Sequence, residues 1–154
     1  MKNGFETYQT TQMMGLSQLD LILTVYKGTI GYVRQAIEHF RNQQIAEGKT
    51  ACEKARRCLV HLYTTLDMEK GQAIADHLGK LYAYMIEELD LAVAGANSGP
   101  LENVIQLLNT IKEGWDGLKS QHEVEAREND AERPEAEMAG APSTDKSGPL
   151  VITA

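Results

Sequence analysis

Residues 17–40 read SQLDLILTVYKGTIGYVRQAIEHF, and this stretch decides the fold. Its apolar residues recur at steps of three and four rather than in alternation, which is the period of one face of an α-helix. Ser17 and Asp20 have the spacing of a capping box, so we expect the helix to begin near Ser17. The stripe that we expect in the core consists of Leu19, Ile22, Tyr26, Ile30, Val33, Ile37 and Phe40.

Three further segments carry the same helical period. We expect helices over about 47–66 and 71–94, and a fourth that opens at Pro100, a residue suited to the first helical turn. Their core stripes are Cys52, Ala55, Leu59, Leu62 and Leu66; Ile74, Leu78, Leu81, Met85 and Leu89; and Leu101, Val104, Leu108, Ile111, Trp115 and Leu118. Short linkers make consecutive helices antiparallel, so the predicted fold is all-α, an antiparallel up-down-up-down four-helix bundle with a short N-terminal helix over 4–13.

Composition and charge bound the organisation of the chain. Its 154 residues, 42% of them hydrophobic, suit one domain with a core, and the net charge of -7 argues against a nucleic-acid partner. Residues 120–154 hold 3 basic and 8 acidic residues and three of the four prolines, with little apolar content. We therefore expect an N-terminal arm over 1–15, the helical bundle over 16–120 and a disordered acidic tail over 121–154, acting as a tether or only as a solubilising extension.

The sequence shows no segment typical of secretion or of insertion into a membrane. The first residues lack the apolar run of a secretory signal, and the longest dense apolar stretch, residues 21–26, is too short to span a bilayer. Cys52 and Cys58 would lie about 120° apart on a helix, so a disulfide between them is not expected. We expect a cytoplasmic protein that does not insert into membranes.

Motifs for catalysis or metal binding are missing from the sequence. None of the four histidines follows a glutamate at the Glu-x-x-His spacing of a di-metal site, and no phosphate loop or nucleophile elbow occurs. Cys58 and His61 could share a helix face, but two ligands do not make a zinc site. We expect no enzyme, no metal and no cofactor, which leaves a small-molecule or metal-sensing bundle as a remote alternative.

Apolar surface exceeds what a bundle core requires. A second stripe consists of Leu21, Val25, Tyr32 and Ala36; Val60 and Tyr63; and Ala75, Tyr82, Ile86 and Val93. A surface helix needs an apolar arc of about 100°, and wider arcs on a soluble protein often indicate a partner site. A broad core or a homodimer face would explain the same pattern.

Residues 66–82 read LDMEKGQAIADHLGKLY, and residues 21–26 read LILTVY. In this order and spacing, with Tyr8 before them and Trp115 near the end of the last helix, the motifs resemble the flagellar export chaperone family FliS. The resemblance covers roughly residues 5–120.

The resemblance implies a client and a mode of binding. Members of the family bind the C-terminal segment of flagellin, which is disordered in the monomer and helical in the filament, and so prevent premature polymerisation before export. A component of the export gate is then a second partner. The client surface that we expect is Leu21, Val25, Tyr26, Tyr32, Val60, Tyr63, Tyr82 and Ile86, with Tyr8 and the N-terminal arm covering the groove until the client displaces them. The alternative function is a self-associating structural bundle, a homodimer that forms in the absence of client.

Overall fold

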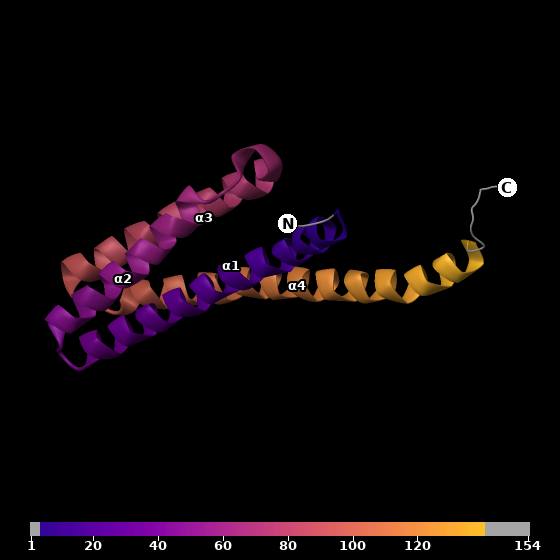
Figure 1. Ribbon diagram of the computed structural model, residues 1–154. Coiled ribbons are helices and arrows are strands. Elements are labelled where there is room, and N and C mark those ends of the chain that lie inside the picture. The colour runs from indigo at the N-terminus through magenta and orange to yellow at the C-terminus, as the bar shows by residue number, and fades with distance from the viewer. Residues whose placement is uncertain (1–3, 141–154) are drawn as a thin grey trace. The chain divides into compact units, whose positions relative to one another are not determined.

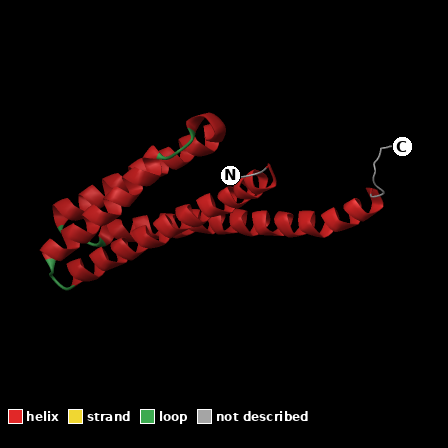
Figure 2. Cartoon of the chain, viewed as in Figure 1, coloured by secondary structure: helices red, strands yellow, loops and turns green. Residues whose placement is uncertain are grey.

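The computed structural model describes the backbone of residues 4–140 and the side chains of residues 18–67 and 71–131. Within this part of the chain there are four helices and no strand (Figure 2). The helices are α1 (Gly4–Arg41), α2 (Ile45–Thr64), α3 (Met68–Gly95) and α4 (Gly99–Gly140). The prediction of an all-α chain with four long helices is confirmed.

Two helix ends differ from the prediction. α1 is continuous from Gly4, so the expected start at Ser17 and the separate helix over 4–13 are wrong. No proline occurs in residues 4–17, and so every residue there can donate the i→i−4 hydrogen bond of a helix. α4 extends through Gly140, so the expected disorder is corrected for residues 121–140, whose many Glu, Ala and Arg residues favour helix. Residues 141–154 lie outside the described part of the chain.

The chain divides into two compact units, Met1–Asp116 and Gly117–Ala154. The first contains α1, α2, α3 and the first part of α4. In the second, nearly all described side chains, over 117–131, are exposed. A helix that is polar on all sides is stabilised by solvation and local charge pairs rather than by a core.

All four helices contribute to one hydrophobic core in the first unit. α2 packs against both α1 and α3 (Figure 1). The largest fully buried side chains are Tyr26, Tyr82, Leu59, Met85, Leu89, Leu101, Leu108, Val33 and Val104. Every helix therefore supplies part of the apolar interior, and the predicted stripes of α1, α2 and α4 provide most of it.

The inner face of α3 is rotated relative to the prediction. Ile74, expected in the core, is 69% exposed, whereas Ala75 and Tyr82, expected on the outside, are buried. Ala75, Tyr82, Met85, Leu89 and Ala92 form the buried face. These residues are spaced by seven, three, four and three, which is as good a helical stripe as the one predicted, and so the period alone did not decide between the two faces.

Short connections join the helices at their ends. Gln43, after α1, and Ala96, after α3, have positive φ values of 63° and 48°, as expected for the residue that reverses the chain after a helix. Before α4, the Asn97 side-chain oxygen accepts a hydrogen bond of 2.9 Å from the Gly99 N–H. This side chain thereby satisfies one of the free N–H groups at the start of the helix.

A close contact between α1 and α2 depends on Gly48. A Cβ atom at this buried position would lie 2.5 Å from the Phe40 ring. We therefore expect Gly48→Ala to lower the free energy of unfolding by about 1–3 kcal/mol, since the ring must shift in a filled core. Urea denaturation followed by circular dichroism measures this change. The control is Gly28→Ala, where nothing lies within 4 Å and alanine should stabilise α1 by about 0.5–1 kcal/mol; equal effects of the two changes would contradict the packing argument.

Candidate partner-binding surface

Several large apolar side chains remain exposed after the core is filled. In the described part of the chain they are Leu21, Val60, Tyr63, Ile74, Tyr84, Leu91, Leu118 and Val124. Exposed side chains of this kind indicate a binding surface where they gather around a hollow rather than stand alone. The hollows of the first unit therefore decide which of them can act together.

Four apolar residues line a groove between α2 and α3. Val60 and Tyr63 come from α2, and Ala83 and Ile86 come from α3. The hollow has a volume of about 220 Å³. Val60 is 38% exposed and Tyr63 is 49% exposed, so both side chains stand at the surface. We call this hollow the α2–α3 groove.

A second hollow continues the α2–α3 groove across Gly79. It has a volume of about 480 Å³ and shares Tyr63 and Ala83 with the first. A Cβ atom on Gly79 would lie 3.6 Å from both Leu66 Cδ1 and Tyr63 Cε2. Because glycine has no side chain, the hollow is deeper at this position. Beside this apolar floor, Lys80 and Asp76 form an ion pair of 3.2 Å. An apolar floor with a polar rim is typical of protein interfaces.

A third hollow, which we call the end groove, involves all four helices and has a volume of about 340 Å³. It is lined by Ile22, Leu62, Thr65, Leu66, Asp67, Gly71, Ile74, Ala75, Leu78, Tyr82 and Trp115. It shares Leu66 and Ala75 with the second hollow. Each of the three hollows thus shares lining residues with the next, from Val60 to Trp115, and we call the three together the apolar path.

Three aromatic side chains lie together where the end groove meets the core. The hydroxyl groups of Tyr26 and Tyr82 are hydrogen-bonded to each other. The Tyr26 ring centroid is 6.4 Å from that of Tyr82 and 6.5 Å from that of Trp115, with tilted rings in both pairs. The Trp115 N–H is buried and faces Tyr26 closely enough to lower its pKa, but it does not reach the geometry of a hydrogen bond. These side chains connect α1, α3 and α4.

Burial changes the acidity of three core groups. It raises the pKa of Tyr26 above its ordinary value, and the hydrogen bond between Tyr26 and Tyr82 offsets part of that rise. Burial also raises the pKa of Tyr82, and the neighbouring Tyr26 raises it further. The pKa of the Cys52 thiol rises to about 11 because the thiol is buried. At neutral pH all three groups are therefore uncharged, as an apolar interior requires.

The structure separates the predicted client residues into three groups. Val60, Tyr63 and Ile86 lie together in the α2–α3 groove. Tyr26 and Tyr82 are 0% and 1% exposed, so neither stands on the outer surface as the predicted client surface requires. Tyr26 instead has the core position that its stripe predicts, and the expected outer position of Tyr82 is wrong. Both face inward because the buried stripes of α1 and α3 pass through them.

The remaining predicted residues lie on α1. Leu21 is 65% exposed, whereas Val25 and Tyr32 are half-buried against the core. Lys54 on α2 places its ammonium group 5.8 Å from the centre of the Tyr32 ring. This cation–π contact links Tyr32 to α2. The side chain of Tyr8 lies outside the described residues, so its predicted role as a groove cover stays a prediction.

Sequence reasoning missed several lining residues of the apolar path. Leu66 and Trp115 were assigned to the core, and Ile74 to an inner face, yet all three border the end groove. One residue indicates such a groove from the sequence alone, since Gly79 is a small residue on an otherwise apolar helix face. Leu66, Ile74 and Trp115 lie where helices diverge, and the apolar pattern of a single helix does not reveal such places.

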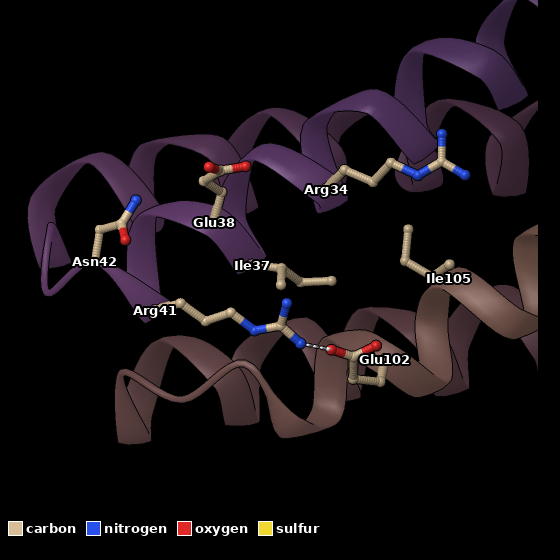
Figure 3. Close-up of a pocket in the computed structure, with 7 residues that line it drawn as sticks. All are labelled: Arg34, Ile37, Glu38, Arg41, Asn42, Glu102 and Ile105. Atoms are coloured by element: carbon tan, nitrogen blue, oxygen red, sulfur yellow. Dashed lines mark hydrogen bonds and ion pairs between the residues drawn. The ribbon is translucent and has the colours of Figure 1, made fainter.

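A polar hollow of about 440 Å³ lies between α1 and α4, away from the apolar path (Figure 3). Arg41 donates a hydrogen bond of 2.6 Å to Glu102, while Arg34 extends away from this pair. Both members of the Arg41–Glu102 pair are well exposed, so the pair contributes little stability. The mixed charges do not suit an apolar helix.

Metal sites and membrane-spanning helices are two further features to consider in the described residues. No group of three or more His, Cys, Asp or Glu side chains is arranged there to hold a metal ion. Nor does any helix in that part of the chain combine the length and apolar character needed to cross a bilayer.

The family model and the similar proteins all indicate the same family. The family model described as "Flagellar protein FliS" matches residues 1–122. The chain is 34% identical over 98 residues to the flagellar secretion chaperone FliSB of Pseudomonas aeruginosa, a match that covers 64% of this chain and 78% of the relative. It is 28% identical over 112 residues to the flagellar secretion chaperone FliS of Campylobacter jejuni, covering 73% and 88%. The corresponding protein of Vibrio cholerae is 24% identical over 126 residues, covering 79% and 93%.

Proposed function

The chain belongs to the FliS family of flagellar proteins, and from this premise we propose that it is a cytoplasmic export chaperone for the C-terminal segment of flagellin. The family and the curated relatives support a chaperone role in flagellar export. Flagellin as the client, the cytoplasm as the location and a component of the export gate as second partner are the finer parts of the proposal. We further propose that the four helices alternate in direction as an up-down-up-down bundle, since short connections join them.

The observation that carries the proposal is the apolar path on the outside of a filled core. Val33, Leu59, Met85 and Leu108 are fully buried, so the core does not need the apolar surface that remains. Its three hollows share lining residues from the α2–α3 groove to the end groove. An elongated apolar surface with polar edges suits an amphipathic helix laid along it.

Such a chaperone offers the client an apolar surface in place of the one on other flagellin molecules. The client segment carries an apolar face that would otherwise join other flagellin molecules. The apolar path removes that face from water, which is a favourable step that needs no nucleotide. Ordering a disordered segment costs roughly 2–5 kcal/mol of the interaction energy. This cost keeps the affinity moderate, which suits a client that has to be released for export.

Binding to flagellin from the organism that encodes the chain tests the proposal. The full chain is mixed with the C-terminal segment of that flagellin and measured by calorimetry and by light scattering after gel filtration. We expect a 1:1 complex with a negative heat-capacity change, which is the mark of apolar burial. A chain that forms homodimers and ignores the segment would instead support the self-associating bundle.

Deletion of residues 1–12 tests the predicted role of the N-terminal arm and Tyr8. If the arm covers the groove, its removal relieves a competitor, so client affinity should rise or stay the same in calorimetry. The helix content of the deleted chain, by circular dichroism, is the control for folding. A large loss of affinity would make the arm a binding element instead.

A further inference from the structure

The aromatic group at the end groove contains more hydrogen-bond donors than its bonds use. Tyr26 and Tyr82 supply two hydroxyl donors, and Trp115 supplies an indole N–H. The bond between the two hydroxyl groups uses one donor. The Trp115 N–H is buried and has no partner among the described residues.

Unused donors in this place are unfavourable for the free protein. A buried donor that has lost its water and gained no acceptor lowers stability. Phenylalanine could fill much of the Trp115 site without carrying a donor. Tyr82 and Trp115 are also the two aromatic residues that line the end groove. The donors therefore lie directly behind a surface on which the client is proposed to bind.

We propose that Trp115 is a specificity-determining residue, which selects a client helix that carries one neutral carbonyl oxygen within its apolar face. This inference rests on the proposed function. The acceptor is the side-chain amide of an Asn or Gln, because the backbone carbonyls inside a helix are already bonded. A carboxylate is disfavoured, since it would lose its hydration among apolar walls and would approach Asp67. The amide oxygen accepts from the Trp115 N–H.

The client oxygen has to reach a donor that is covered in the free protein. The indole ring therefore turns toward the end groove when the client binds. Trp115 is the only tryptophan of the chain, so a single indole N–H signal reports this change in a proton–nitrogen NMR spectrum. Formation of the hydrogen bond moves the proton signal downfield.

Trp115→Phe in the full chain tests the proposal with the flagellin C-terminal segment as probe. We expect an affinity loss of about tenfold, from the loss of one hydrogen bond to a desolvated acceptor. The melting temperature of the client-free variant should fall only as far as the loss of packing by the smaller phenylalanine ring accounts for. The indole N–H makes no hydrogen bond in the client-free protein, so its removal should not lower the melting temperature further. Tyr84→Phe is the matched control, since it removes an exposed hydroxyl on α3 that lines none of the hollows of the apolar path and should leave the affinity unchanged.

A second arm of the experiment locates the acceptor. Each Asn and Gln of the segment is replaced in turn by Leu. One replacement should weaken binding to the wild-type chain and have no effect on binding to Trp115→Phe. If the wild-type chain binds the segment but Trp115→Phe binds it equally well and the indole signal stays in place, the inference is overturned while the proposed function stands. If the wild-type chain does not bind the segment at all, the proposed function itself fails.

Discussion

A chain that carries Val60→Asp and Tyr63→Asp is expected to lose roughly a hundredfold or more of its affinity for the flagellin segment. Full burial of a large apolar side chain contributes about 1.5–3 kcal/mol, and Val60 and Tyr63, which are 38% and 49% exposed, each have roughly half of that still to gain at an interface. A carboxylate enclosed by an apolar partner without a counter-ion adds a desolvation cost. A hundredfold loss corresponds to about 2.8 kcal/mol, which is less than the sum of these effects.

The folded state of this variant should survive, because both side chains are partly exposed and stand outside the core. Circular dichroism and thermal unfolding check this point, and calorimetry gives the affinity. The matched control is Leu91→Asp, since Leu91 is 58% exposed on α3 but does not line the apolar path. If Leu91→Asp weakened the complex as much as the double change, the binding surface would be elsewhere than the apolar path.

A single change on α1 tests whether the client surface extends from the apolar path onto that helix. Leu21 is 65% exposed and shares none of the three hollows of the apolar path. Full loss of binding in Leu21→Asp would extend the client surface onto α1. Unchanged binding would restrict that surface to α2, α3 and the end groove.

The helical fold could be predicted from the sequence because each helix has a long apolar period and the connections are short. The period of α3 nevertheless fits two faces almost equally well. One face carries Ile74 and Leu81, and the other carries Ala75 and Tyr82. Which face turns inward depends on the neighbours of α3, since the Tyr82 hydroxyl finds its partner only on α1. A contact between residues 56 positions apart is not contained in a local pattern.

The client surface was predictable only where one helix displays it. Val60 and Tyr63 could be assigned from α2 alone, because they lie off its core stripe. The end groove could not, since Ile22, Leu78 and Trp115 come from three helices that meet only in the folded chain. The sequence places Tyr26 both on the core stripe of α1 and on the expected client surface, and only the packing of several helices decides for the core.

The buried groups of the core should make the protein sensitive to alkali. In the unfolded chain Cys52 loses its proton near pH 9 and the tyrosines near pH 10, their ordinary pKa values. In the folded chain the pKa of Cys52 is about 11, and burial raises the pKa of Tyr26 and Tyr82. The stability that these shifts provide is fully present below pH 9 and is lost as the pH rises through the folded pKa values. Each group that is ionised only in the unfolded chain removes roughly 1.4 kcal/mol per pH unit.

The expected result is a fall in the free energy of unfolding that begins near pH 9, where Cys52 loses its proton in the unfolded chain, and becomes steeper above pH 10, where the tyrosines add to it. Urea denaturation at pH 8, 9, 10 and 11 in the presence of a reductant measures it. Two variants assign the effect. Cys52→Ala should move the onset from pH 9 to pH 10, because only the tyrosines then titrate. Tyr26→Phe with Tyr82→Phe should keep the onset at pH 9 but flatten the slope above pH 10. A wild-type slope that both variants leave intact would show that alkaline unfolding arises from other groups, such as the surface lysines, and not from the core.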